Sequence, residues 1–178
     1  MGKLTKEEEM LLSSYSPSTN KKGAAFFYLN AMIIAAAPLY LFYGVHQMEI
    51  YDSLMVFGLS AVLTTYLIQL ACKNQKKLLK HQIVMKRGPA VDREINSKFG
   101  NDKKMTIKEK EERALFRKNE VADTESTYLA VFYTNTLFLT LTLVCAFFLL
   151  ANLAPVFNLL ISTVGSAALV AFLSTAKN

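Results

Sequence analysis

The sequence predicts an all-α membrane protein with four transmembrane helices in two hairpins and a helical cytosolic insert between the second and third spans. The chain of 178 residues is 52% hydrophobic and has a mean hydropathy of +0.25. Charged residues are absent from three long segments, 24–45, 53–72 and 126–176. Basic residues all fall on one side of the spans that these segments imply. The three observations together indicate the fold class.

The first two apolar segments each have the length of one membrane span. An α-helix rises about 1.5 Å per residue, so ~20 residues cross a hydrocarbon core of roughly 30 Å. A cleaved signal peptide is the competing interpretation of residues 24–45. That segment starts late, is longer than a usual signal core and follows the acidic run 7–9, so we expect it to remain in the mature protein.

The third apolar segment is too long for one span. Its fifty-one uncharged residues are interrupted at 151–155 by the sequence ANLAP, which suits a tight turn at a membrane interface. We therefore predict a third span at 128–150 and a fourth at 156–175.

The basic residues predict the orientation of these spans. Fifteen of the 20 Lys and Arg lie between Lys73 and Lys118, and the other five lie before the first span or after the fourth. None lies in the two short loops. The positive-inside rule then assigns segments 1–23, 73–127 and 176–178 to the cytosol, and the loops 46–52 and 151–155 to the lumenal side.

The predicted spans contain no Asp, Glu, Lys, Arg or His. Transporters and proton pumps usually place ionisable groups inside their spans, where the substrate or proton binds. Asn30, Gln69 and Asn135 are amides within the spans, and we expect each to hydrogen-bond to a neighbouring helix. A small four-span transporter or channel with a regulatory cytosolic loop remains the alternative from another functional class.

Residues that could carry catalysis or bind a metal or other cofactor are not recognisable in the sequence. The two histidines, His46 and His81, fall on opposite sides of the predicted membrane and cannot share a site. Cys72 and Cys145 lie within or at the end of spans, where they read as small packing residues. We expect a protein that is not an enzyme and has no cofactor.

The cytosolic insert is predicted to contain three helices. Residues 73–87 continue the second span, Gly88-Pro89 is expected to end that helix, and residues 90–99 can form a short one. Thr106 and Glu109 fit a capping box that starts the third helix. The third helix is expected to pack through an apolar stripe at near seven-residue spacing, formed by Ile107, Ala114, Leu115 and Val121.

Two basic surfaces are predicted on this insert. The first is a juxtamembrane stripe that comprises Lys73, Lys76, Lys77 and Lys80. The last three follow Lys73 by three, four and seven residues, so the four lysines share one helix face just outside the membrane. Anionic lipid would attract them there. The second follows the third helix, where Lys110, Arg113 and Arg117 share one face and Lys103 and Lys104 precede them. If the insert projects beyond a Debye length of about 8 Å, lipid explains this second surface poorly. A nucleic-acid phosphate backbone explains it better, and an acidic protein or a lipid-binding, membrane-shaping hairpin stays open as an alternative.

Particular strings of the sequence resemble the gamma subunit of the translocon-associated protein complex, also called the signal sequence receptor gamma subunit. The string KNEVAD at 118–123 and the string FYTNTLFL at 132–139 carry most of the resemblance. The run KKMTIKEKEER at 103–113, the residues that follow the second span and the C-terminal LST add to it. The likeness covers nearly the whole chain.

The resemblance implies a non-catalytic protein of the endoplasmic reticulum membrane with four spans and both termini in the cytosol. It implies a complex with alpha, beta and delta subunits beside the Sec protein-conducting channel, where secretory and membrane proteins are translocated during their synthesis. It also implies that the cytosolic domain contacts the large ribosomal subunit through ribosomal RNA and protein. The contact would fall on Lys103, Lys104, Lys108, Lys110, Arg113, Arg117 and Lys118.

Overall fold

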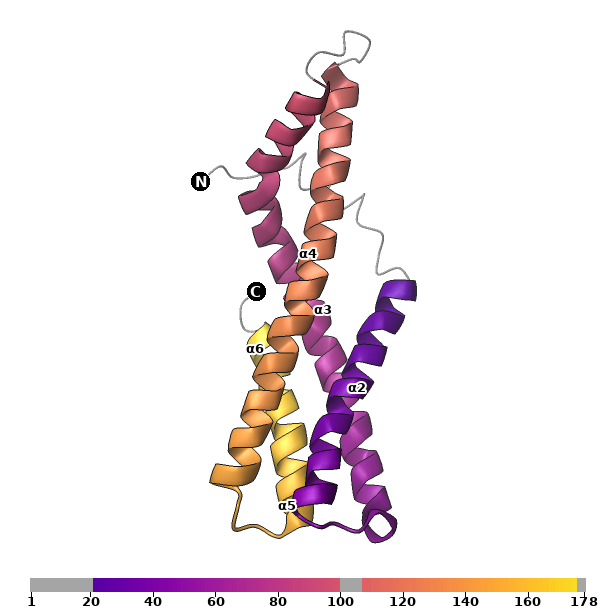
Figure 1. Cartoon of the computed structure of the whole chain (residues 1–178), viewed down its shortest axis with the longest axis vertical. Helices are drawn as coiled ribbons and strands as arrows, with labels where there is room; N and C mark the ends of the chain where they lie inside the picture. Colours follow the sequence, from indigo (N-terminus) through magenta and orange to yellow (C-terminus); the bar gives the residue numbers. More distant parts are fainter. Residues whose placement is uncertain (1–20, 100–106, 176–178) are drawn as a thin grey trace. The chain divides into compact units, whose positions relative to one another are not determined.

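A computed structural model of the chain describes residues 21–99 and 107–175, and every regular element within these ranges is helical. The order of the elements can be followed along the chain in Figure 1. They are α2 (Lys21–Val45), α3 (Ile50–Phe99), α4 (Ile107–Val144), the π-helical turn η1 (Cys145–Leu149), α5 (Pro155–Leu160), the π-helical turn η2 (Ile161–Gly165) and α6 (Ser166–Thr175).

Four helical stretches are long and apolar enough to cross a membrane, judged by length and composition. This result confirms the predicted fold class, an all-α membrane protein with four candidate spans. The stretches are Gly23–Val45, Tyr51–Lys98, Glu109–Leu149 and Pro155–Thr175.

The predicted end of the second helix at Gly88-Pro89 is wrong, because α3 continues through both residues to Phe99. A proline inside a helix removes one backbone hydrogen bond and costs about 3 kcal/mol. Val84 and Val91 lie on either side of this proline, seven residues apart and both buried. Burial of such side chains stabilises by about 1.5–3 kcal/mol each, so packing of the helix face outweighs the cost of the proline.

The described residues fall into two compact units. We call residues 76–99 and 107–129 the hairpin unit, because it consists of two antiparallel helical segments, from α3 and α4. We call residues 21–75 and 130–175 the bundle unit. The charged run after residue 107 and the apolar segment after residue 128 belong to a single helix, α4.

The bundle unit has an aromatic and small-residue core. Phe27, Ile68 and Phe138 are almost completely buried in one cluster, together with alanines from three helices and Cys72. Alanine at such positions allows helices to approach closely, which is how helices associate when lipid supplies no hydrophobic drive. Cys72 therefore packs as the sequence predicted, and Cys145 is a half-buried free thiol.

Amide side chains join helices of the bundle unit. Asn30 of α2 and Asn135 of α4 donate to each other, at 3.2 and 2.9 Å, which confirms the predicted interhelical bonding of this pair. Gln69 is buried, but its amide nitrogen meets no acceptor in the described residues, so its predicted bond is not made by that nitrogen. Asn158 is a further buried amide that the prediction missed, and it donates to the carbonyl of Ala146 at 3.0 Å. That carbonyl belongs to a last helical turn, where backbone acceptors lack intrahelical partners.

Candidate docking surface of the hairpin unit

The helix seam of the hairpin unit is narrow and only partly apolar. Its buried cluster consists of Ile83 and Val84 from α3 and Ala122 from α4, with Leu79 and Leu129 packed against it. Val91 and Ile95 of α3 are buried as well, and polar contacts between the two helices add to this apolar packing.

Buried residues of α4 differ from the predicted apolar stripe. Ala114, Leu115 and Val121 are only half-buried, whereas the buried residues of this segment are Asn119, Ala122 and Ser126. Their spacing of three and four residues places them on one helix face. Hydrophobicity alone could not reveal this face, because two of its three residues are polar.

Asp123 of α4 holds two lysines of α3. The Lys76 ammonium lies 3.0 Å and the Lys80 ammonium 3.5 Å from the same carboxylate oxygen. The lysine side chains are 23% and 16% exposed, whereas the Asp123 side chain that they share is 49% exposed. Two of the four lysines of the predicted juxtamembrane stripe therefore pair with Asp123 and help to align the two helices of the hairpin unit.

The other two lysines of that stripe have different surroundings. Lys73 belongs to the bundle unit, where its ammonium lies 5.6 Å from the centre of the Tyr28 ring, a cation–π distance. Lys77 is exposed. The structure thus does not present the four lysines as one continuous surface.

Two further ion pairs cross between the helices. Arg87 lies 3.4 Å from Glu125, and Lys118 lies 2.8 Å from Asp92. The Lys118 side chain is 16% exposed. Lys118, a predicted ribosome-contact residue, is therefore committed to a contact within the hairpin.

Lys110, Arg113 and Arg117 lie on the outer side of α4, away from the buried face. Arg113 is 3.6 Å from Glu109, and Arg117 is 2.7 Å from Glu120, both within the same helix. The hydrogen bond and charge of Glu120 raise the pKa of Arg117 above its ordinary value, so its positive charge is held more firmly. Both arginines remain about half exposed, so an incoming anion can still reach them.

For three of the predicted contact residues no side-chain position is described. Lys103 and Lys104 lie outside the described residues. Lys108 belongs to α4 by its backbone, and its side chain also lies outside the description.

The excess of positive charge is on α3 and not on α4. Residues 76–99 contain seven basic and two acidic side chains, whereas residues 107–125 contain five basic and six acidic ones. Lys86 and Arg93, seven residues apart on one helix face, are exposed and form no ion pair within the described ranges. The prediction missed them, although their spacing and the count of charges were visible in the sequence.

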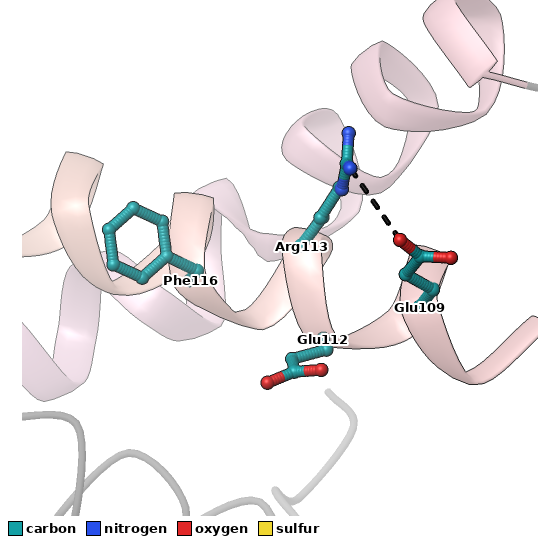
Figure 2. Close-up of a pocket in the computed structure, with 4 residues that line it drawn as sticks. All are labelled: Glu109, Glu112, Arg113 and Phe116. Atoms are coloured by element: carbon teal, nitrogen blue, oxygen red, sulfur yellow. Dashed lines mark ion pairs between the residues drawn. The ribbon is translucent and has the colours of Figure 1, made fainter. Parts of the chain in front are cut away.

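A shallow, open hollow of about 330 Å³ lies on α4 at the same level as the outer basic residues. Glu109, Glu112, Arg113 and Phe116 line it, as Figure 2 shows. The Phe116 ring is 57% exposed and is an exposed large apolar side chain in a unit otherwise rich in charge. Its surface is suited to contact with another molecule, because aromatic and charged side chains together are typical of interfaces.

Metal-ligating side chains are not gathered anywhere in residues 21–99 and 107–175, where His, Cys, Asp and Glu form no group of three that could hold an ion. His46 instead stacks between two aromatic rings, with its ring centre 4.5 Å from that of Phe42 and 5.7 Å from that of Phe147.

Comparison with known proteins points to one family. The sequence model of the family described as translocon-associated protein, gamma subunit (TRAP-gamma), matches residues 7–176. The translocon-associated protein subunit gamma of Dictyostelium discoideum is 26% identical over 151 residues, which cover 85% of each chain.

Proposed function

The chain belongs to the TRAP-gamma family, and from this premise we propose that it is a non-catalytic subunit that docks the translocon-associated complex on the ribosome. The proposed contact is with the large ribosomal subunit, at the endoplasmic reticulum membrane. It would support the translocation of secretory and membrane proteins while they are being synthesised. Its proposed partners are the alpha, beta and delta subunits, the Sec protein-conducting channel and the surrounding membrane lipid.

The observation that carries this proposal is the excess of basic residues in the hairpin unit of a membrane protein of this family. Residues 76–129 contain fourteen basic and nine acidic side chains, whereas the uncharged segments 24–45, 53–72 and 130–175 belong to the bundle unit. A surface with excess positive charge attracts a polyanion such as ribosomal RNA, and phosphate contacts supply affinity without reading sequence.

The proposed topology follows the one-sided distribution of basic residues. Segments 1–23, 73–127 and 176–178 would be cytosolic, and the short connections 46–52 and 151–155 would be lumenal. The hairpin unit is then on the side of the membrane where ribosomes are found.

The proposed contact residues are those whose charge is not used to align the hairpin. We assign the ribosomal RNA contact to Lys103, Lys104, Lys108, Lys110, Arg113 and Arg117, joined by Lys86 and Arg93 of α3. Lys118, Lys76 and Lys80 have a structural role instead, because each pairs with an aspartate across the seam. Lys73 and Lys77 are left to meet anionic lipid headgroups.

Co-sedimentation with purified ribosomes tests the proposal. The full chain is placed in nanodiscs of neutral lipid, and its affinity is measured at 50 and 200 mM salt. If ~5 phosphates are engaged, the affinity falls by about two to three decades over this range. A variant with Gln at Lys103, Lys104, Lys110, Arg113 and Arg117 should lose most of the affinity and of its dependence on salt.

A matched control removes an equal number of charges elsewhere. It carries Gln at the five basic residues outside the insert, which are Lys3, Lys6, Lys21, Lys22 and Lys177. The control should bind ribosomes like the unchanged chain. Salt-insensitive binding, or equal losses in both variants, would sink the proposal, and tighter binding to anionic vesicles than to ribosomes would favour the lipid-binding alternative.

A further inference from the structure

The bundle unit contains two separate apolar clusters with a polar layer between them. The first cluster includes Ile68 and Phe138, and the second includes Phe57 and Leu159. On α3, α4, η2 and α6, every buried side chain that lies between the two clusters carries a hydroxyl. We call this set the hydroxyl layer, and its members are Ser60, Thr64, Thr142, Ser162, Thr163 and Ser166.

Thr64 and Thr142 lie at the same level of the bundle unit. The first cluster takes Ile68 from α3 and Phe138 from α4, and the second takes residues nearer the start of α3 and beyond the end of α4. The two helices therefore run antiparallel within this unit. Thr64 precedes Ile68 by four residues and Thr142 follows Phe138 by four, so each lies about one helical turn from the first cluster.

Three hydroxyls of the layer have no hydrogen-bond partner among the described residues. They are the Oγ1 atoms of Thr64 and Thr142 and the Oγ atom of Ser166, on residues that are at most 3% exposed. The other hydroxyls donate to a carbonyl of their own helical stretch, as Ser60 does with Phe57 at 3.1 Å, and each can still accept. Native proteins pair nearly all buried polar groups, so the three hydroxyls indicate a bound molecule that pairs with them.

The backbone is also irregular at the level of the hydroxyl layer. Pro38 lies inside α2 and has no N–H, so the carbonyl of Ile34 loses its helix donor. Ala35 beside it is buried and small. On the fourth span, the π-helical turn η2 replaces the regular helix between the two clusters. Such turns within helices are frequent at functional sites.

We propose that the hydroxyl layer binds ordered water inside the bundle unit. A buried water makes about three hydrogen bonds, so it can accept from one hydroxyl and donate to others that no protein group reaches. Water then joins α3, α4 and α6 at a level where apolar packing does not. The inference is independent of the proposed ribosome contact.

The chemistry of the layer selects water over other small ligands. A cation among membrane spans needs a charged partner, and no charged side chain lies within residues 32–41, 58–67, 139–145 or 160–166. An apolar molecule would leave the three hydroxyls unpaired, which is costly. A neutral molecule that both donates and accepts satisfies them.

Transfer of magnetisation from water to protein in solid-state NMR tests the inference directly. The full chain is labelled with ¹³C-threonine and reconstituted in bilayers of neutral lipid, and its threonine signals are assigned sequentially. Thr64 and Thr142 should receive magnetisation from water early. Thr134 is the internal control and should receive it late, because it is equally buried but its hydroxyl already bonds to the Cys72 side chain. Transfer to Thr64 and Thr142 as slow as to Thr134 would overturn the inference.

Thermal unfolding supplies a second measurement, and its sign separates a hydrated layer from a dry one. Thr142→Val replaces the hydroxyl with a methyl group of similar size. If the hydroxyl binds water, the variant loses that bond and its unfolding midpoint falls by about 2–4 °C. If the layer is dry, the midpoint rises, because an unpaired polar group has been removed.

Thr140→Val is the matched control, since Thr140 belongs to the same helix but is exposed. This variant should not lower the midpoint. A rise in Thr142→Val, or an equal fall in both variants, would contradict the proposed water site. Should Thr142→Val fail to fold, the magnetisation transfer in the unchanged chain still decides between a hydrated and a dry layer.

Discussion

In the hairpin unit, α3 and α4 are joined largely by ion pairs, whereas in the bundle unit the helices are joined by aromatic rings, alanines and one pair of amides. The hairpin seam contains a buried cluster of three apolar residues, and four cross-helix ion pairs surround it. The bundle unit buries Phe27, Phe42 and Phe138 almost completely and contains no ion pair among its described residues.

The difference follows from the surroundings that each unit is suited to. In water an ion pair at the surface costs little to form and adds little to the stability of the fold. Several such pairs can therefore occur between two helices and favour one alignment of them. In hydrocarbon an unpaired charge is costly, while an amide pair and close packing are tolerated. Some buried hydroxyls of the bundle unit bond to a carbonyl of their own helical stretch, as Thr163 does with the Leu159 carbonyl at 2.6 Å.

The largest effect should come from truncating an aromatic side chain in the bundle unit. Phe138→Ala removes a fully buried ring and should lower the free energy of unfolding by about 3 kcal/mol or more. Thermal unfolding in detergent, followed by circular dichroism, measures the loss. Phe132→Ala is the control, because Phe132 is on the same helix but is 62% exposed, and its effect should stay within about 0.5 kcal/mol. Equal losses would show that α4 is oriented differently in the bundle.

A smaller effect is expected from breaking the amide pair of the bundle unit. Asn135→Leu leaves the Asn30 amide without its partner and should cost about 1 kcal/mol, measured by the same unfolding experiment. The double variant with Leu at both positions should recover most of this loss, because two apolar groups can replace a bonded pair. Additive losses in the double variant would mean that the two amides do not act together.

The smallest effect should come from the ion pairs of the hairpin unit. Asp123→Asn removes the carboxylate that holds Lys76 and Lys80 and should destabilise the protein by about 0.5–1 kcal/mol at low salt. High salt should reduce the difference, which would distinguish it from the salt-independent losses in the bundle unit. A double-mutant cycle with Lys76→Met gives the coupling energy, and a coupling of zero would assign the alignment of the helices to packing alone.

The sequence predicted the membrane part well and the hairpin less well, for a physical reason. Exclusion of charge from hydrocarbon is a property of each segment by itself, so the apolar segments could be located without knowing their neighbours. The helix through Gly88 and Pro89 could not be predicted, because the packing that offsets the proline is tertiary: Val84 belongs to a buried cluster that α3 shares with α4. The buried face at Asn119, Ala122 and Ser126 was missed because it is polar in composition.

The candidate docking surface also depends partly on the sequence alone and partly on the tertiary structure. The sequence alone determined that the basic residues gather in one segment, that the apolar segments exclude charge, and that Lys110, Arg113 and Arg117 share a helix face. Only the tertiary structure decided which basic groups remain for a partner, since Lys76, Lys80 and Lys118 pair with residues on the facing helix. Such a pairing depends on the register of two helices whose paired residues are far apart in the sequence, and no local pattern of charges contains that register.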